Sequence, residues 1–336
     1  MRFNGFVLLP LLMLALSPVA RSDSAEPDQG YLLRPPVFLT DEHDVPLTTF
    51  AASVPVPGQF MLCSSASSPE SDSFVQNGAD VQPALKLSRI GLAAGVMRGM
   101  RRGSAFGILV PASWIVVRSG IGGLPATGDT YGLGGAILFA KKTLRTGANG
   151  GVVVGSFGLE LPTGKDDATF DQSNAVTNAY YSGCPRRMPL AWQPSNGATN
   201  LHLVLSYGRA IRRVSYQGIL AYKLNGAGDE DVRLGSVIVG ALSATYGLSP
   251  GIAGSLEVVF RSQGNDSYPN APAPGVSQPA LAGTTTHGTS LSINPSIRCS
   301  LGKRLTIGLG ARLSVIKPDD GMVPRSRLFL ILYPNF

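Results

Sequence analysis

The sequence predicts an all-β protein, a transmembrane antiparallel up-and-down β-barrel of about 12 strands. The first observation is that short basic links alternate with long polar connections between strand-like segments. The second is a strand-like last stretch, residues 328–336, that ends on Phe336. Bacterial outer-membrane barrels pair short periplasmic turns with longer outer loops. The short links are residues 100–103, 145–147, 211–213, 248–250 and 302–304, and the longest connections are 165–196 and 265–287.

The N-terminal residues have the plan of a secretory signal peptide. Arg2 precedes an apolar run at residues 6–20, and the small residues Ala20 and Ser22 close the segment. The run is shorter than the roughly 20 residues that a membrane-spanning helix needs. We therefore expect a signal peptide at 1–22, a periplasmic N-terminal extension at 23–56 and an outer-membrane β-barrel at 57–336, in the outer membrane of a Gram-negative-type bacterium.

Composition and charge narrow the partners. Charged residues make up 15% of the 336 residues, below the roughly 25% typical of soluble domains. The formal net charge of +7 is concentrated in the short links. A basic rim favours outer-membrane lipid with anionic headgroups, although the same charges would also suit solvated turns. Because the cations are spread over separate turns, the sequence does not predict nucleic acid as a partner.

The chain then shows twelve strand-like segments, a weak first one followed by a Ser-rich loop at 67–80 and eleven stronger ones. Most have the roughly 9–11 residues that a tilted transmembrane strand needs. An even number also returns the C-terminus to the periplasmic side. The strands are expected near residues 59–65, 84–96, 105–117, 131–142, 152–161, 200–207, 214–224, 236–246, 252–261, 290–299, 305–316 and 328–333.

Alternation along the strands assigns residues to two faces. At 200–207, Leu203 and Leu205 lie on an apolar face, and His202 lies on a polar one. A soluble β-protein would turn the apolar face inward, but the signal peptide, the even count and the alternation of links favour lipid as its partner. The last strand is apolar on both faces, so it either packs against the N-terminal extension or has another register.

Charged residues on the polar faces are the best candidates for a transport site. Four are basic and two are acidic, and rings of charge select permeating ions by sign, so a weak preference for anions follows. The alternative is that these charges pair across the lumen and fill it. The pore-lining candidates are Glu160, Lys223, Glu257, Arg261, Arg298 and Arg312.

The sequence predicts no catalytic, cofactor or metal site. His202 and Ser206 share one strand face but lie about 13 Å apart, too far for proton transfer. No cluster of His, Cys and Asp has the spacing of metal ligands. The three cysteines, Cys63, Cys184 and Cys299, are interpreted as small apolar residues, and a Cys63–Cys184 disulfide is left open.

One strand end carries a family resemblance. Gly155 to Gly164 has the pattern Gly-x-x-Gly-x-x-Leu-Pro-Thr-Gly, and it is neither a sortase site nor a P-loop. This strand end, Gly128-Asp129 and the succession at 290–315 resemble the outer-membrane transporter-like family named for the meta pathway of phenol degradation, over roughly residues 85–336.

The resemblance implies a barrel associated with uptake of small, often aromatic compounds. We therefore expect a non-enzymatic outer-membrane channel or transporter for small-molecule solutes. The alternatives are an outer-membrane lipid-modifying barrel enzyme and a closed structural barrel that serves as a scaffold for partners.

Overall fold

The computed structural model describes residues 54–55, 57–71, 73–76, 79–81, 85–119, 126–164, 194–228, 233–265, 267, 288–301, 305–316, 321–323 and 327–334. The expected signal peptide, nearly all of the expected N-terminal extension and most of the two longest connections lie outside these residues. The boundaries proposed for these three segments therefore stay predictions. In the described part of the chain, no helix has the length and apolar character needed to cross a membrane.

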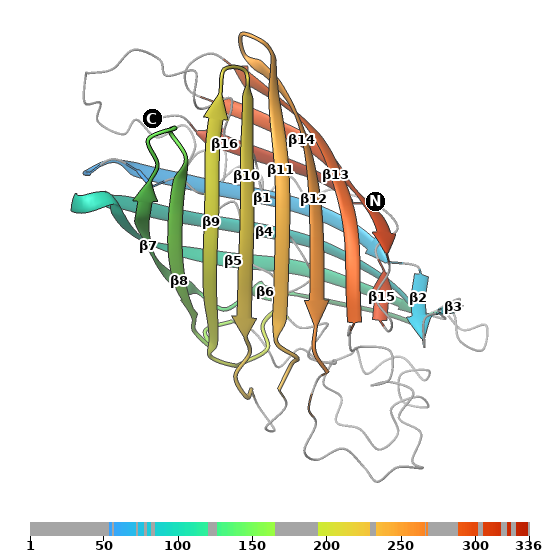
Figure 1. Ribbon diagram of the computed structural model, residues 1–336. Coiled ribbons are helices and arrows are strands. Elements are labelled where there is room, and N and C mark those ends of the chain that lie inside the picture. Colours follow the sequence, from blue (N-terminus) through green and yellow to red (C-terminus); the bar gives the residue numbers. More distant parts are fainter. Residues whose placement is uncertain are drawn as a thin grey trace.

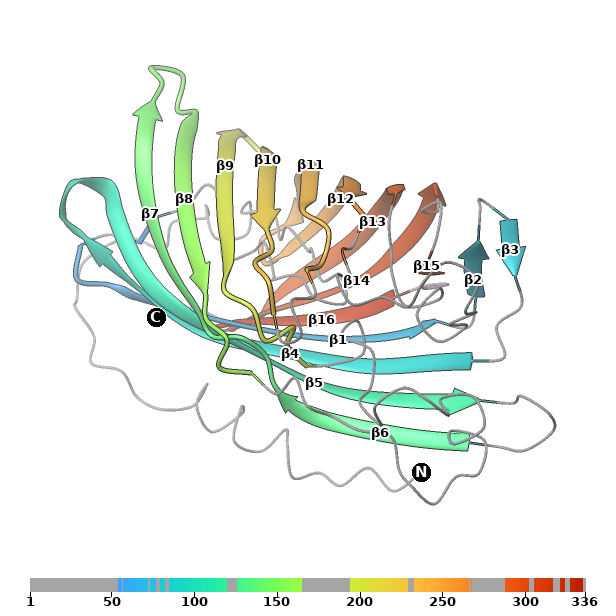
Figure 2. The ribbon, with the colours of Figure 1, turned by 90° about the horizontal axis from the view of Figure 1, so that it is seen from below.

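A single antiparallel sheet closes on itself to form a barrel (Figures 1 and 2). Its thirteen strands follow the order β4-β1-β16-β14-β13-β12-β11-β10-β9-β8-β7-β5-β6, and β4 also pairs with β5. The strands are β1 (Phe60–Ser71), β4 (Leu85–Met100), β5 (Ser104–Ser119), β6 (Ala126–Leu133), β7 (Ile137–Thr146), β8 (Val152–Glu160), β9 (Asn200–Ile211), β10 (Val214–Leu224), β11 (Val237–Ser249), β12 (Ile252–Gln263), β13 (Gly288–Leu301), β14 (Leu305–Ile316) and β16 (Arg327–Pro334).

The thirteen strands occupy twelve positions around the ring. β6 pairs with residues 112–119 of β5, and β7 pairs with residues 104–109 of the same strand. These two strands thus follow one another along a single position. Almost every neighbour in the ring is also a neighbour in sequence, which makes the topology up-and-down. The predicted fold class is confirmed.

The single strand predicted at 131–142 is wrong, because the chain is broken there between β6 and β7. The amide of Gly134 donates to the carbonyl oxygen of Pro111 on β5 at 2.8 Å. In an antiparallel ladder the N–H and C=O of one residue point to the same neighbour. Pro111 has no N–H to offer on this side, so the strand is interrupted opposite the one residue that cannot complete the pairing.

The Leu-Pro-Thr-Gly turn after β8 packs against this break. The amide of Leu161 donates to the carbonyl of Ala136 at 2.8 Å, and the amide of Ala136 donates to the Thr163 hydroxyl oxygen at 2.9 Å. A Cβ on Gly164 would lie 2.5 Å from the carbonyl carbon of Gly134. The motif therefore ends β8 at Glu160, as a strand-terminating proline predicts, and satisfies backbone groups that the break leaves without a ladder.

A second sheet corrects the prediction that residues 67–80 form only a loop. β1 extends to Ser71, and β2 (Ser73–Gln76), β3 (Ala79–Val81) and β15 (Gly321–Val323) form a separate three-stranded antiparallel sheet. Figure 1 shows it beyond the end of the barrel wall, beside the end of β13. Serine-rich segments of three or four residues have little periodicity. β2 lies between β3 and β15, and its pairing partners in β15 are about 250 positions later in the sequence.

The outer face of the barrel is an apolar band of membrane-spanning height. On β11 the outward side chains of Ile238, Leu242, Tyr246 and Leu248 are exposed. Ten steps of about 3.3 Å, tilted by about 40°, span about 25 Å along the barrel axis. This matches the apolar band of outer-membrane barrels.

Where their side chains are described, the residues predicted to face outward on other strands are exposed or half-buried, and the intervening polar side chains are buried or half-buried. The side chains of β16 lie outside the described set, so the two-sided apolar pattern of the last strand stays untested. The exposed outward residues on β9, β10, β13 and β14 include Leu203, Leu205, Tyr207, Tyr216, Leu220, Tyr222, Ile297, Leu309, Leu313 and Val315.

The short links that lie within the described residues are tight turns at one end of the barrel. Arg102 and Arg212 adopt positive φ values of 59° and 52°, and Gly251 has a φ of 93°. The amide of Gly58 donates to the carbonyl of Gly99 at 3.0 Å, so β1 begins at this end. The end of β16 lies there too, because Pro334 pairs with Leu305. Both described ends of the barrel therefore lie with the short turns, as predicted.

The packing of Gly164 predicts a specific loss of stability. Gly164→Ala places a Cβ 2.5 Å from the Gly134 backbone and 2.5 Å from the Cβ of Ser195, which costs about 1–3 kcal/mol of overpacking. The matched control is Gly240→Ala on β11, where a Cβ meets no atom within 4 Å. The stability of both variants is measured by urea titration of the refolded barrel. The folded fraction is read from the heat-modifiable mobility of the barrel in electrophoresis. Equal stability of the two variants would contradict the packing role of the turn.

Candidate functional site on the inner face of the barrel

All six predicted pore-lining residues lie on the inner face of the barrel. Five of them are buried, with exposed fractions from 2% for Glu257 and Arg298 to 8% for Arg312, and Arg261 is half-buried. The prediction of their face from strand alternation is correct. Their role in lining a pore is a separate matter and stays a prediction.

Glu160, His202 and Lys223 meet on three neighbouring strands. Glu160 lies beside Asn200 across the β8–β9 ladder, and His202 lies beside Lys223 across the β9–β10 ladder. One carboxylate oxygen, Glu160 Oε2, is 3.0 Å from His202 Nε2 and 3.1 Å from Lys223 Nζ. The acidic charge on this wall is therefore compensated by a lysine, and a histidine is fixed against the same oxygen.

Asparagine side chains surround this cluster at the end of the barrel opposite the short turns. Asn196 and Asn200 exchange two side-chain hydrogen bonds of 3.3 and 3.2 Å. The side-chain oxygen of Asn200, Oδ1, also accepts from the Gly226 amide at 3.1 Å. Asn225 accepts at its backbone carbonyl from Arg233 Nε at 2.9 Å. These bonds join the chain that precedes β9 to the chain that follows β10.

Charged residues on β12 to β14 are bonded to neutral polar side chains. Asn294 Nδ2 donates to Glu257 Oε2 at 2.8 Å, across the β12–β13 ladder. Arg298 donates from one terminal nitrogen to Thr245 Oγ1 at 3.2 Å. Arg312 Nε donates to Ser292 Oγ at 3.1 Å. Each of these contacts joins neighbouring strands or, for Arg298 and Thr245, reaches across two ladders.

Arg298 and Arg312 share the interior but do not face one another. Arg298 on β13 pairs with Gly308 on β14, four residues from Arg312. Four steps of about 3.3 Å separate the two backbones by about 13 Å along the strand. The two guanidinium groups therefore occupy different levels of the wall, which reduces the repulsion between them.

The inner face is closely covered. Thr245 is 0% exposed, and Ser206 and Ser292 are each 1% exposed. A wide water-filled pore leaves the side chains of its wall accessible to water. Along the described part of the wall, this arrangement instead fits a narrow or closed interior.

His202 and Ser206 are not arranged as a catalytic pair. His202 Nε2 is bonded to Glu160, and the Ser206 hydroxyl donates to the carbonyl of Val154 at 3.3 Å. A nucleophile and its base need a hydrogen bond between them. Among the described residues, no group of three or more His, Cys, Asp or Glu side chains is placed to hold a metal ion. Cys299 is a free, exposed thiol.

The sequence analysis missed His202 as a partner of Glu160, because the two residues are 42 positions apart. The ends of the two strands could have revealed this contact. β8 ends at Glu160, and β9 begins at Asn200, which is the residue that pairs with Glu160 in the ladder. Aligning these ends places His202 two residues further along, on the inner face. The length of the connection hid that alignment.

No family model and no curated protein matches the sequence. The resemblance to the phenol-degradation transporter-like family is therefore not confirmed. Among solved structures, an outer-membrane channel from Pseudomonas putida F1 matches with a TM-score of 0.62 at 13% identity, covering 84% of this chain and 97% of that chain.

Two further barrels match less closely. The β domain of the Bordetella autotransporter BrkA has a TM-score of 0.47 at 12% identity, covering 83% of this chain and 100% of that chain. A mutant of the monoaromatic hydrocarbon channel TodX has a TM-score of 0.43 at 10% identity, covering 85% and 92%. The Pseudomonas likeness shows that this chain has the fold of an outer-membrane β-barrel.

The Glu160–Lys223 contact predicts strong coupling between these two residues. Glu160→Gln alone removes the negative charge of a buried ion pair and lowers stability by about 3–5 kcal/mol. Adding Lys223→Met recovers part of the loss, with a coupling energy of about 1–3 kcal/mol in a double-mutant cycle. The control cycle pairs Glu160→Gln with Arg261→Gln, four strands away, and is additive. Urea titration gives all the values, and additivity in the first cycle would refute the contact.

Proposed function

We propose that the protein is a narrow outer-membrane channel for small solutes. The observation that carries the proposal is the closed barrel with two opposite faces, an apolar band outside and charged and amide side chains inside. A barrel that only anchors itself in lipid gains nothing from buried charges, because each costs desolvation free energy. The fold of the Pseudomonas outer-membrane channel supports the same function.

The charges on the inner face favour anionic solutes. Lys223 compensates Glu160 at 3.1 Å. The wall of β12 to β14 carries Arg261, Arg298 and Arg312 against Glu257, so positive charge is in excess there. Guanidinium groups bind carboxylates through paired hydrogen bonds. Small carboxylates, including aromatic acids, are therefore the proposed solutes.

The location and orientation follow from the same features. The export signal read at residues 1–22 and the outward apolar band support insertion in the outer membrane. The short turns and both described ends of the barrel would lie on the periplasmic side, as in other outer-membrane barrels. Lipid is then the partner of the outer face, and the channel needs no cofactor.

A closed structural barrel is the second candidate, and the burial of the inner face favours it. Side chains such as Thr245 and Asn200, both 0% exposed, are as well covered as in the core of a soluble protein. Such a barrel would serve as a scaffold for partners and would not conduct. The lipid-modifying enzyme has no comparable support from the arrangement of His202 and Ser206.

Conductance of the purified protein tests the channel directly. In planar bilayers we expect discrete steps, smaller than those of wide general pores, because the inner wall is closely packed. Liposomes that contain the protein should swell in small carboxylates such as benzoate and exclude large sugars. Absence of conductance and of hydrolysis would favour the scaffold. If the protein does not conduct but hydrolyses lipid, and His202→Ala abolishes the hydrolysis, the enzyme would be favoured.

The two inner arginines test the proposed selectivity. Replacing both Arg298 and Arg312 with Gln removes two positive charges and keeps polar side chains, so the chloride-to-potassium permeability ratio should fall by about twofold or more. Reversal potentials in a salt gradient measure the ratio.

The matched control for this experiment is Arg212→Gln with Arg213→Gln, which removes two cations from a turn outside the lumen and should leave the ratio unchanged. An unchanged ratio in a folded, conducting Arg298/Arg312 variant would identify these residues as structural.

A further inference from the structure

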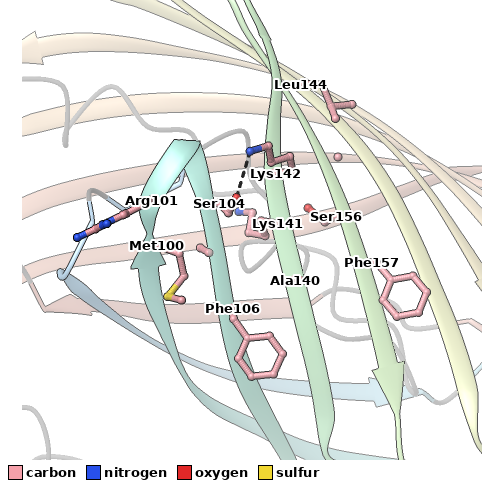
Figure 3. A pocket seen from close by; sticks show the side chains of 12 residues that line it. Met100, Arg101, Ser104, Phe106, Ala140, Lys141, Lys142, Leu144, Ser156 and Phe157 are labelled. Carbon is pink, nitrogen blue, oxygen red and sulfur yellow. Dashed lines mark hydrogen bonds between the residues drawn. The ribbon is translucent and has the colours of Figure 1, made fainter.

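A groove of about 750 Å³ lies on the barrel wall beside the turn that joins β4 to β5. It is lined from β4, β5, β7 and β8, and Figure 3 shows it from close by. Its apolar walls belong to the outward face and adjoin the apolar band, and the inner-face residues Ala105, Lys141 and Ser156 lie behind them.

Small residues form the floor of the groove, and aromatic residues form its sides. Phe106 on β5 pairs with Ala140 on β7, and Ala140 pairs with Phe157 on β8. Both phenylalanine side chains are about half exposed, at 54% and 48%. In Figure 3 the two rings stand on either side of Ala140 and point out of the wall. The result is an apolar slot along β7, bounded by two side chains that lie on either side of it at a spacing of about 4.8 Å per strand.

A cation is fixed at the short-turn end of this slot. Lys142 Nζ donates to the carbonyl oxygen of Arg102 at 2.6 Å and to Ser104 Oγ at 3.2 Å. The positive φ of Arg102, 59°, belongs to the tight turn from which this carbonyl is offered. A lysine ammonium has three N–H groups. Two of them make these hydrogen bonds, which fix the side chain, and the third can donate to an acceptor in the groove. Arg101, on the same turn, also lines the groove.

We propose that this groove binds one anionic phospholipid of the membrane leaflet at the short-turn end. An acyl chain lies along β7 between Phe106 and Phe157, and the phosphate accepts hydrogen bonds from Lys142 and Arg101. Ala140 and Lys142 are two residues apart, about 7 Å along the strand, so the cation lies beyond the floor of the slot on the side of the short turns. The proposal rests on the membrane location and is independent of conduction.

The sign of the headgroup follows from the two cations. A zwitterionic phospholipid carries its own ammonium beside the phosphate, which competes with the protein for the phosphate oxygens. A phospholipid with a net negative charge has no such internal partner, and surface cations attract it. Two cations at one end of a hydrocarbon slot therefore select an anionic lipid over a neutral one.

Lipid binding to the purified full-length protein tests the proposal. Dioleoylphosphatidylglycerol or dioleoylphosphatidylcholine is added to the protein in dodecyl maltoside, and native mass spectrometry counts the bound lipid. We expect one phosphatidylglycerol to bind at least about tenfold more tightly than phosphatidylcholine. Lys142→Gln with Arg101→Gln should remove this preference. Equal affinity for the two lipids, or an unchanged preference in this variant, overturns the proposal.

A second variant tests the slot separately from the cations. Ala140→Trp fills the floor and should weaken phosphatidylglycerol binding by about tenfold or more. Ala244→Trp, another small outward residue on β11, is the control for bulk on the outer face, and Arg212→Gln is the control for a lost turn cation. Both controls should bind as the unmodified protein does. If a control variant weakens phosphatidylglycerol binding as much as its matched variant does, the proposal is overturned.

Inorganic phosphate distinguishes the lipid from a simple anion site. Millimolar phosphate should not displace phosphatidylglycerol, because the acyl chain contributes most of the affinity. If phosphate displaces phosphatidylglycerol, and does so equally in the Ala140→Trp variant, the groove is a simple anion site and the proposed lipid site is refuted. If Ala140→Trp does not fold, the Lys142 and Arg101 variant still decides the outcome, since it keeps the shape of the wall. A barrel that binds the lipid but does not conduct would refute the channel and leave this inference intact.

Discussion

The structure depends on one requirement: every backbone N–H and C=O in the membrane-spanning wall needs a partner within the protein. Hydrocarbon offers no hydrogen bonds, so a sheet that crosses it must close into a ring. Here the ring closes through the pairing of β16 with β1 and of β1 with β4, and then from β4 to β5. Once the ladder is continuous, strand alternation turns one set of side chains to lipid and the other to the interior.

Pro111 interrupts this ladder, and the local structure is organised around the interruption. Because proline offers no donor, the facing strand breaks into β6 and β7, and the carbonyl of Pro111 is still satisfied by the Gly134 amide at 2.8 Å. The turn after β8 then supplies Thr163 as an acceptor for the Ala136 amide at 2.9 Å. Gly135 matters for the same reason, since a Cβ there would lie 2.8 Å from Cγ of Glu160. The break and the charged cluster of the interior are thus in direct contact.

Much of the fold was predictable, because apolar and polar residues alternate with a period of two along the strands of a membrane barrel. The bounds of β10 and β14 are those predicted, and the inward position of all six charged candidates follows from the same period. The features that were missed depend on long-range contacts. The break at Gly134 depends on a proline one strand away, β2 and β3 depend on β15, and the partner of Glu160 is 42 residues distant. Local periodicity contains none of these contacts, and it does not identify a solute.

The position of β1 in the ring has a consequence for how the barrel is made. β1 lies between the last strand and the rest of the wall, and six residue pairs align it with β16, compared with sixteen between β4 and β5. The first and last parts of the chain must therefore meet across more than 250 residues, which is the strand pairing of greatest loop-closure entropy among those that the structure describes. The wall cannot be sealed before β16 is available to pair with β1. Closure of the ring therefore requires the first and the last strand to be in place together.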